Sequence, residues 1–205
     1  MANIRIKSQW FRAGSARTAP QNASAIAFIV WRVAENMLNQ MRSAHFDIDI
    51  GPQYFAFTRE VLVFLIQLVD RMAYERMDAD ARAEFITALV QRVAEVLQEN
   101  EDRLLGAPGA GQPSQYDQLI DLFNALADHY ADFGFDAQGP DFAFVRYLGH
   151  RVEAIMLQKD QRWVVEQIMA AEVPDAVQML QRAVHEVLST EARAPRAARA
   201  GARGD

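Results

Sequence analysis

Apolar residues recur along most of this chain at the three- and four-residue spacing of an amphipathic helix. Between residues 25 and 41 they occupy positions 26, 29, 30, 33, 37, 38 and 41, which share one face of a helix. The same periodicity predicts helices over 52–77, 79–105, 114–133 and 140–158. Residues 163–171 either continue the helix at 140–158 or follow a kink near Asp160, and 174–190 form the last helix. The pattern therefore predicts an all-α bundle of six or seven helices without a substantial sheet.

Capping residues and helix breakers mark where the predicted helices begin and end. Residues 107–113 combine glycine and proline and form the clearest loop, which divides a helical domain at 20–190 into halves 20–106 and 114–190. Short polar side chains favour helix starts and glycines favour helix ends. The candidate N-caps are Asn22 or Ser24, Asp78 or Asp80, and Ser114, and the candidate ends are Gly106 and Gly134.

One phrase occurs twice. Phe46-Asp47, Gly51-Pro52 and Phe55-Ala56-Phe57-Thr58-Arg59 return as Phe135-Asp136, Gly139-Pro140 and Phe142-Ala143-Phe144-Val145-Arg146. In each copy the proline is expected in the first helical turn, where a missing N–H has no consequence. The phrase indicates either two pseudo-repeated helical pairs or two helices with the same start chemistry. The helices that the two copies open differ in their polar residues, because Glu60, Gln67 and Asp70 align with Tyr147, Ala154 and Leu157.

Composition narrows the class of protein. The chain has 205 residues, 51% of them apolar, which is enough for one helical domain with a sizeable core. Cysteine is absent, which excludes disulfides and thiolate chemistry and is typical of a reducing compartment. No secretory leader is expected. The longest apolar run, at 61–66, extends to 69 with only Gln67 interrupting it and is shorter than the roughly 20 residues that a bilayer span needs. We therefore expect a soluble cytoplasmic protein.

The charge is distributed unevenly. Residues 1–19 carry four basic side chains and no acid, and residues 192–205 carry four arginines and one acid. The net charge is −6, so the segment between these ends carries −13. We predict a basic N-terminal arm at 1–19 and a disordered basic tail at 191–205. Binding of nucleic acid through these ends is a further alternative, although no folded basic patch accompanies them.

A polar group interrupts the most apolar predicted helix, at 52–77. Glu60, Gln67 and Arg71 lie along one track of that helix, with Asp70 beside them. If the helix is central, these side chains form a buried polar network or a small-ligand site, since buried polar groups must be paired. If it is peripheral, they are the wet side of an amphipathic helix, which is the arrangement we expect.

Signatures of catalysis and metal binding are missing. The sequence has no nucleophile elbow, phosphate loop or dinucleotide fingerprint, and no Glu-x-x-His pair of the kind that holds metals in helical bundles. His150 with Glu153, and His129 beside Asp128 and Asp132, are expected to lie on the surface. We therefore expect no cofactor, no metal site and no catalytic residue.

Several residues carry a resemblance to other proteins. They are Glu60, Phe64, Asp70-Arg71 and Ala73, then Arg82, Phe85 and Leu89, and later Phe123-Asn124 and Tyr130. Through them the chain resembles a set of small, all-helical bacterial proteins of uncharacterised function. Those proteins tend to have a histidine near the position of Gln67, which this chain lacks. The resemblance implies a bacterial helical domain and no activity.

The sequence is consistent with two different functions. The first is a protein-interaction module, an adaptor, chaperone or assembly factor that binds a protein partner or a second copy through an apolar helix face, because the helix at 52–77 is apolar on nearly all sides. The alternative is a bundle that binds a small molecule or metal, with or without enzymatic activity, in a cleft between the halves. The speculative ligand-binding residues are Glu60, Gln67, Asp70, Arg71, His129, Tyr130 and His150.

Overall fold

The computed structural model describes residues 18–107, 109 and 111–189, so the predicted basic arm and tail lie almost wholly outside the described residues. The described part is helical, which confirms the all-α class. The elements are α1 (Ala19–Ser43), α2 (Pro52–Tyr74), α3 (Ala79–Leu105), α4 (Gln115–Ala131), β1 (Phe135–Asp136), β2 (Gly139–Pro140), α5 (Phe142–Glu153), α6 (Gln158–Gln167) and α7 (Val173–Leu188). None of these helices is both long and apolar enough to cross a membrane.

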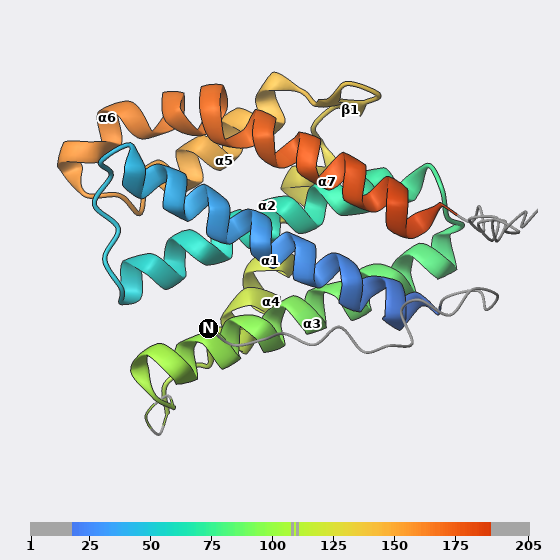
Figure 1. Cartoon of the computed structure of the whole chain (residues 1–205), viewed down its shortest axis with the longest axis horizontal. Helices are drawn as coiled ribbons and strands as arrows, with labels where there is room; N and C mark the ends of the chain where they lie inside the picture. The colour runs from blue at the N-terminus through green and yellow to red at the C-terminus, as the bar shows by residue number, and fades with distance from the viewer. Residues whose placement is uncertain (1–17, 108, 110, 190–205) are drawn as a thin grey trace, which may run out of the picture.

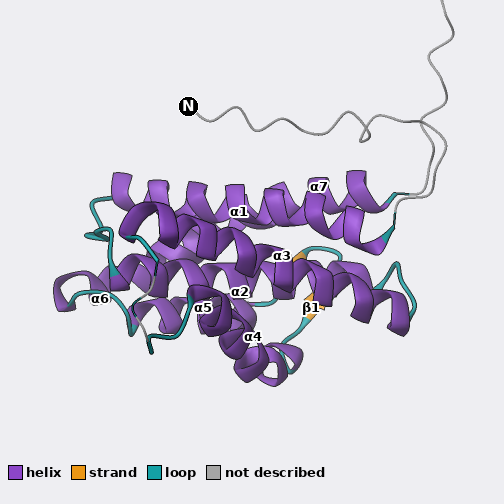
Figure 2. Cartoon of the chain, turned by 90° about the horizontal axis from the view of Figure 1, so that it is seen from below, coloured by secondary structure: helices purple, strands orange, loops and turns teal. Residues whose placement is uncertain are grey.

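Helix α2 lies at the centre of the fold. It contacts α1, α3, α4, α5 and α7, and α1 and α7 run side by side in opposite directions (Figure 1). Figure 2 shows α1 and α7 on one side of α2 and α4 on the other. The side chains from Val61 to Val69 are all buried. The other helices that pack around α2 therefore explain why its sequence is apolar on nearly every side.

Local start signals placed α3 and α4 correctly. The Asp78 carboxylate accepts a hydrogen bond from the Ala81 N–H at 2.9 Å, and the Ser114 hydroxyl accepts one from the Asp117 N–H at 3.0 Å. Both are N-caps of the expected kind. Helix α3 spans the predicted 79–105 and ends at Gly106, whose φ is 84°. Helix α4 ends at Ala131, earlier than the predicted stop at Gly134.

The expected start of α1 is wrong. Asn22 and Ser24 lie inside the helix, which begins at Ala19. The Thr18 N–H donates to the side-chain oxygen of Gln21 at 3.1 Å, as in a capping box, and Pro20 lies in the first turn. This start signal precedes the periodic apolar positions that begin at residue 26, and it determines the helix start in place of the candidate caps Asn22 and Ser24.

The repeated phrase has two different geometries. Pro52 occupies the first turn of α2 as predicted, but Pro140 lies in β2, so the prediction for the second copy is wrong. Helix α5 starts after Asp141, whose carboxylate accepts hydrogen bonds from the N–H groups of Phe144 and Gly134 at 2.7 and 2.9 Å. This aspartate stands where the first copy has a glutamine, and its cap moves the helix start past the proline.

The C-terminal segments predicted as separate helices form one continuous helix from Gln158 to Leu188. A π-helical turn, Ile168–Glu172, joins α6 to α7, and the Val173 N–H donates to the carbonyl oxygen of Ile168. Pro174 is the second residue after this turn. Since proline lacks an N–H and its ring excludes the carbonyl one turn earlier, the wider turn lets the helix continue through it. Helix α5 ends at Glu153, short of the expected residue 158.

Candidate functional site

The polar group on α2 is largely inside the molecule. Only 5% of Glu60 and 6% of Gln67 is exposed, and Asp70 and Arg71 are half-buried. The expectation that these residues form the wet side of the helix is therefore wrong for Glu60 and Gln67. The reason is the central position of α2, because other helices cover the face that periodicity alone assigned to solvent.

The charged members of this group do not pair with one another. Glu60 accepts two hydrogen bonds from the guanidinium of Arg151 on α5, from Nε at 3.1 Å and from Nη2 at 2.5 Å. Asp70 lies 3.4 Å from Arg82 on α3. Burial raises the pKa of Asp70, and the two nearby arginines oppose this rise. The group is therefore a set of connections from the central helix to its neighbours.

Arg71 connects α2 to the end of α4. Its Nη2 atom lies 2.9, 2.6 and 3.2 Å from the carbonyl oxygens of Tyr130, Ala131 and Phe133. The last carbonyls of a helix have no partners within it and carry partial negative charge. Arg71 thus caps the C-terminus of α4 from another helix.

Two buried polar side chains near α2 have no hydrogen-bond partner in the described part of the chain. They are the amide nitrogen of Gln67 and the hydroxyl of Tyr130. The Tyr130 ring packs against Phe64, Phe144 and Tyr147, with centroids 6.3, 5.0 and 5.1 Å away. Burial raises the pKa of the Tyr130 hydroxyl well above its ordinary value, and the negative charge of Glu60 adds to this rise.

The two candidate histidines lie on the surface, as expected. His129 stacks on Tyr147, and its Nδ1 lies 3.2 Å from the Tyr147 hydroxyl. His150 lies between Arg146 and Glu153, 3.1 and 3.0 Å from their side-chain atoms. Neither histidine joins a group of three or more potential metal ligands within the described residues.

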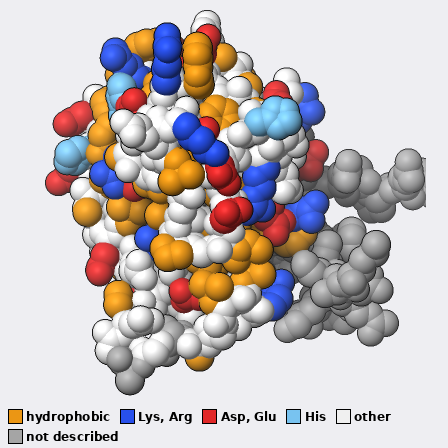
Figure 3. Space-filling model, turned by 90° about the vertical axis from the view of Figure 1, so that its left-hand side faces the viewer, with side chains coloured by type: hydrophobic (Ala, Val, Ile, Leu, Met, Phe, Trp, Pro, Cys, Tyr) orange, Lys and Arg blue, Asp and Glu red, His pale blue; other side chains and the backbone are white. Residues whose placement is uncertain are grey.

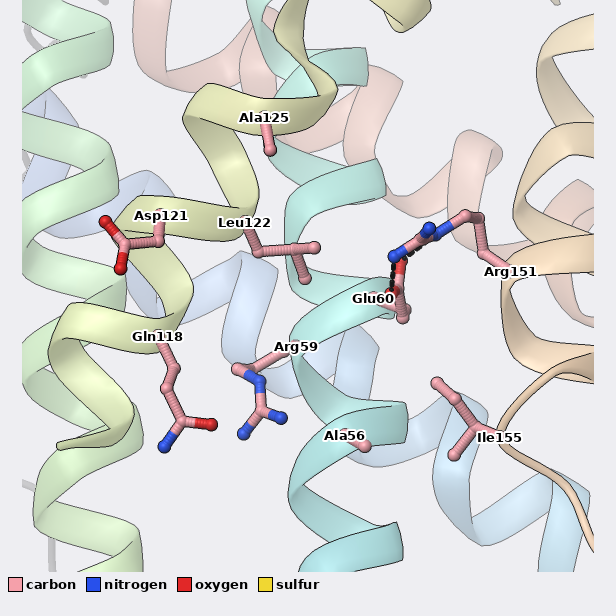
Figure 4. A pocket seen from close by; sticks show the side chains of 9 residues that line it. All are labelled: Ala56, Arg59, Glu60, Gln118, Asp121, Leu122, Ala125, Arg151 and Ile155. Atoms are coloured by element: carbon pink, nitrogen blue, oxygen red, sulfur yellow. Dashed lines mark hydrogen bonds and ion pairs between the residues drawn. The ribbon is translucent and has the colours of Figure 1, made fainter. Parts of the chain in front are cut away.

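A cleft of about 470 Å³ opens between α2, α4 and α5 (Figure 4). Its lining comes from both halves of the chain: Ala56, Arg59 and Glu60 from α2, Gln118, Asp121, Leu122 and Ala125 from α4, Arg151 from α5, and Ile155. Of the speculative ligand-binding residues, Glu60 alone belongs to this lining. Gln67, Asp70, Arg71, His129, Tyr130 and His150 do not line it.

The cleft places Arg59 between α2 and α4. Figure 4 shows its guanidinium directed toward the α4 side of the cleft. Its Nη1 donates a hydrogen bond to the side-chain oxygen of Gln115, whose amide nitrogen in turn donates to Glu101 at 2.8 Å. No carboxylate of the described residues lies within ion-pair distance of Arg59. Burial lowers the pKa of Arg59, and the charges of Glu60 and Glu101 oppose this effect.

Reasoning from the sequence missed two residues of this site. Arg151 bears no local signal, since its partner lies 91 positions away. Arg59 had a signal in the repeated phrase, where it aligns with Arg146, but the alignment does not show which arginine faces a cleft.

Comparison of the chain with protein-family models, curated proteins and solved structures finds no match.

Proposed function

We propose that this protein is a helical protein-interaction module that binds a partner at the cleft between α2, α4 and α5. The observation that carries the proposal is the position of Arg59, a half-buried cation without an acidic partner among the described residues, at the wall of an open cleft. This surface replaces the apolar face of α2 that the sequence pattern indicated, because the side chains from Val61 to Val69 are buried by other helices.

The shape of the cleft favours a protein partner over a small molecule. Small-molecule sites enclose most of their ligand in an apolar cavity. Here Asp121 and Ala125 on the wall are exposed, and more than a third of the Arg151 side chain is accessible. A small ligand in this cleft would stay largely in water, whereas a folded partner or peptide would cover the cleft together with its rim.

Exposed apolar side chains extend this surface on two sides. Leu157, 47% exposed, follows two residues after Ile155 of the lining. Leu104 and Leu105 are exposed and follow Glu101, which accepts the hydrogen bond from Gln115. Hydrophobic side chains also alternate with charged groups of both signs on the face shown in Figure 3. A mixture of apolar and charged groups is the usual composition of a non-obligate interface.

Both halves of the chain would contribute to this binding surface. The bundle would act as one unit, in which α2 of the first half and α4 and α5 of the second form the binding surface. The repeated phrase then has a structural role at two helix entries, and a duplicated binding site is not required. We further propose that the protein acts in the bacterial cytoplasm without catalytic activity of its own.

Selection of peptides from a display library on the immobilised full chain tests this function. We expect peptides that bind with micromolar Kd and shift the amide resonances of residues 56–60, 118–125 and 151–155. Ala125→Arg, an exposed change in the cleft, should abolish this binding. Ala143→Arg, at another exposed alanine, on α5 and outside the lining, should leave it intact. Peptides that bind both variants equally, or no binding peptide at all, would overturn the proposal.

A further inference from the structure

We infer that the cleft recognises an acidic side chain of its partner, and that Arg59 holds the carboxylate. This inference rests on the proposed function and adds the chemistry of the partner to it. The guanidinium is the group of choice for such recognition, because its planar array of donors matches the two oxygens of a carboxylate.

The Arg59 guanidinium has few partners in the part of the chain that the structure describes. Within the described residues it donates to one neutral acceptor, the amide oxygen of Gln115. A guanidinium carries five N–H donors, so most of them are free to bind a ligand. The neighbouring carboxylates are engaged elsewhere, since Glu60 binds Arg151 and Glu101 binds Gln115.

The partial burial of the Arg59 charge has an energetic cost. Withdrawing a charged group from water is unfavourable unless an opposite charge compensates it. Arg59 is half-buried and forms no ion pair within the described residues, and the charges of Glu60 and Glu101 offset its burial only from beyond ion-pair distance, so a carboxylate placed beside its guanidinium would be favourable. Covering of the cleft by a partner would strengthen that ion pair further, because exclusion of water lowers the local dielectric.

The charges of the lining favour a carboxylate over a phosphate. The charged groups of the lining are Arg59, Arg151, Glu60 and Asp121, so their formal charges cancel. Arg151 is already bound to Glu60 in a bidentate pair and adds no free charge for a dianion. Sites for phosphorylated segments are clusters of basic groups. One arginine without an ion pair among the described residues, in a lining whose formal charges cancel, instead fits a single negative charge.

The first arm of the test needs no known partner. The full chain is titrated with the amide of N-acetylglutamic acid, a single-carboxylate probe, while the Nε–H resonances of its arginines are recorded by NMR. We expect the Arg59 resonance to shift at millimolar probe and the Arg146 resonance to stay in place. Phenyl phosphate is the comparison probe and should act more weakly. No shift at Arg59, or a stronger effect of phenyl phosphate, would overturn the inference.

The second arm uses the peptides selected on the full chain. Replacement of one peptide acid by its amide should weaken binding about 10- to 100-fold, and Arg59→Gln should cause a loss of similar size that is not additive with it. Arg59→Lys should recover part of the affinity because it keeps the charge, and Arg146→Gln, the aligned arginine outside the cleft, should have no effect. Thermal melting verifies that each variant is folded.

The outcomes separate this inference from the proposed function. Peptides that bind in the cleft but carry no required acid, or that bind Arg59→Gln unchanged, would overturn the inference and leave the interaction module in place. A shift of Arg59 with the carboxylate probe, together with a failure to select any peptide, would retain the carboxylate site and remove the protein partner.

Discussion

Glu60 and Arg151 join the two halves of the protein through one buried carboxylate. The two residues lie 91 positions apart, and two hydrogen bonds connect them at 3.1 and 2.5 Å. The pair is asymmetric, because 6% of the Glu60 side chain but 36% of the Arg151 side chain is exposed. Loss of one partner should therefore have a different effect from loss of the other.

We predict that Arg151→Met destabilises the protein more than Glu60→Met does. The first change leaves a carboxylate buried without a partner, which costs about 3 kcal/mol in comparable sites. The second leaves a guanidinium that can reach water, so we expect a loss of about 1–2 kcal/mol. Urea unfolding followed by circular dichroism measures both values.

The double variant Glu60→Met/Arg151→Met provides the control for this asymmetry. It removes both charges together and should be more stable than Arg151→Met alone. Equal losses in the two single variants would show that Glu60 finds water or another donor when Arg151 is absent.

Arg71 should stabilise the end of α4 locally. We predict that Arg71→Gln lowers the free energy of unfolding by about 1–2 kcal/mol, because it removes a positive charge and its hydrogen bonds from the last carbonyls of the helix. Hydrogen exchange should speed up at residues 126–134 more than in α1. Arg92→Gln, which removes an arginine from an exposed ion pair on α3, should change neither quantity measurably. Exchange that rises uniformly along the chain would contradict a local cap.

The sequence predicted those elements whose signals are local. The starts of α3 and α4 depend on Asp78 and Ser114, each of which bonds to a backbone N–H three residues later. The surface positions of His129 and His150 were predicted because acidic side chains, which stand near both in the sequence, are seldom fully buried. Such features are readable because the interacting atoms lie within one turn of one another.

The candidate site depends on contacts that periodicity does not contain. A helical pattern shows that Glu60 and Gln67 share a face but not which helix covers it. The cover comes from the second half of the chain, where Arg151 supplies the partner of Glu60. The predicted start of α5 was wrong for a related reason. The Asp141 carboxylate accepts hydrogen bonds from the N–H of Gly134, in the preceding turn, and from the N–H of Phe144, in its own helix.

Tyr130 and Tyr54 offer a matched pair of buried hydroxyls. The Tyr130 hydroxyl has no hydrogen-bond partner in the described part of the chain, whereas the Tyr54 hydroxyl donates to the Asn100 side chain at 3.1 Å. We predict that Tyr130→Phe raises the free energy of unfolding by about 1 kcal/mol, since it removes an unpaired polar group from the core. Tyr54→Phe should lower it by about 1 kcal/mol. Thermal and urea unfolding of both variants test the prediction, and a destabilised Tyr130→Phe would reveal a bound water or a moving partner.

Glu172 should make the stability of the protein depend on pH. Its side chain is 1% exposed in the π-helical turn, Gln167 donates to one carboxylate oxygen at 2.9 Å, and the other oxygen has no partner among the described residues. Burial raises its pKa above the ordinary value of 4.5. Between these two pKa values the folded state holds a proton that the unfolded state has released. The free energy of unfolding therefore falls as pH rises from about 4.5 to the pKa of Glu172 in the folded protein, and the loss is constant above it.

We predict that Glu172→Gln stabilises the protein by about 1–3 kcal/mol at pH 8 and changes its stability little below pH 4, because the amide cannot ionise. Glu166→Gln, an exposed change on the same continuous helix, is the control and should leave the pH profile unchanged. Urea unfolding between pH 3 and pH 8 measures the effect, and a Glu172→Gln protein that is less stable at pH 8 would show that the charged carboxylate has a partner in the core.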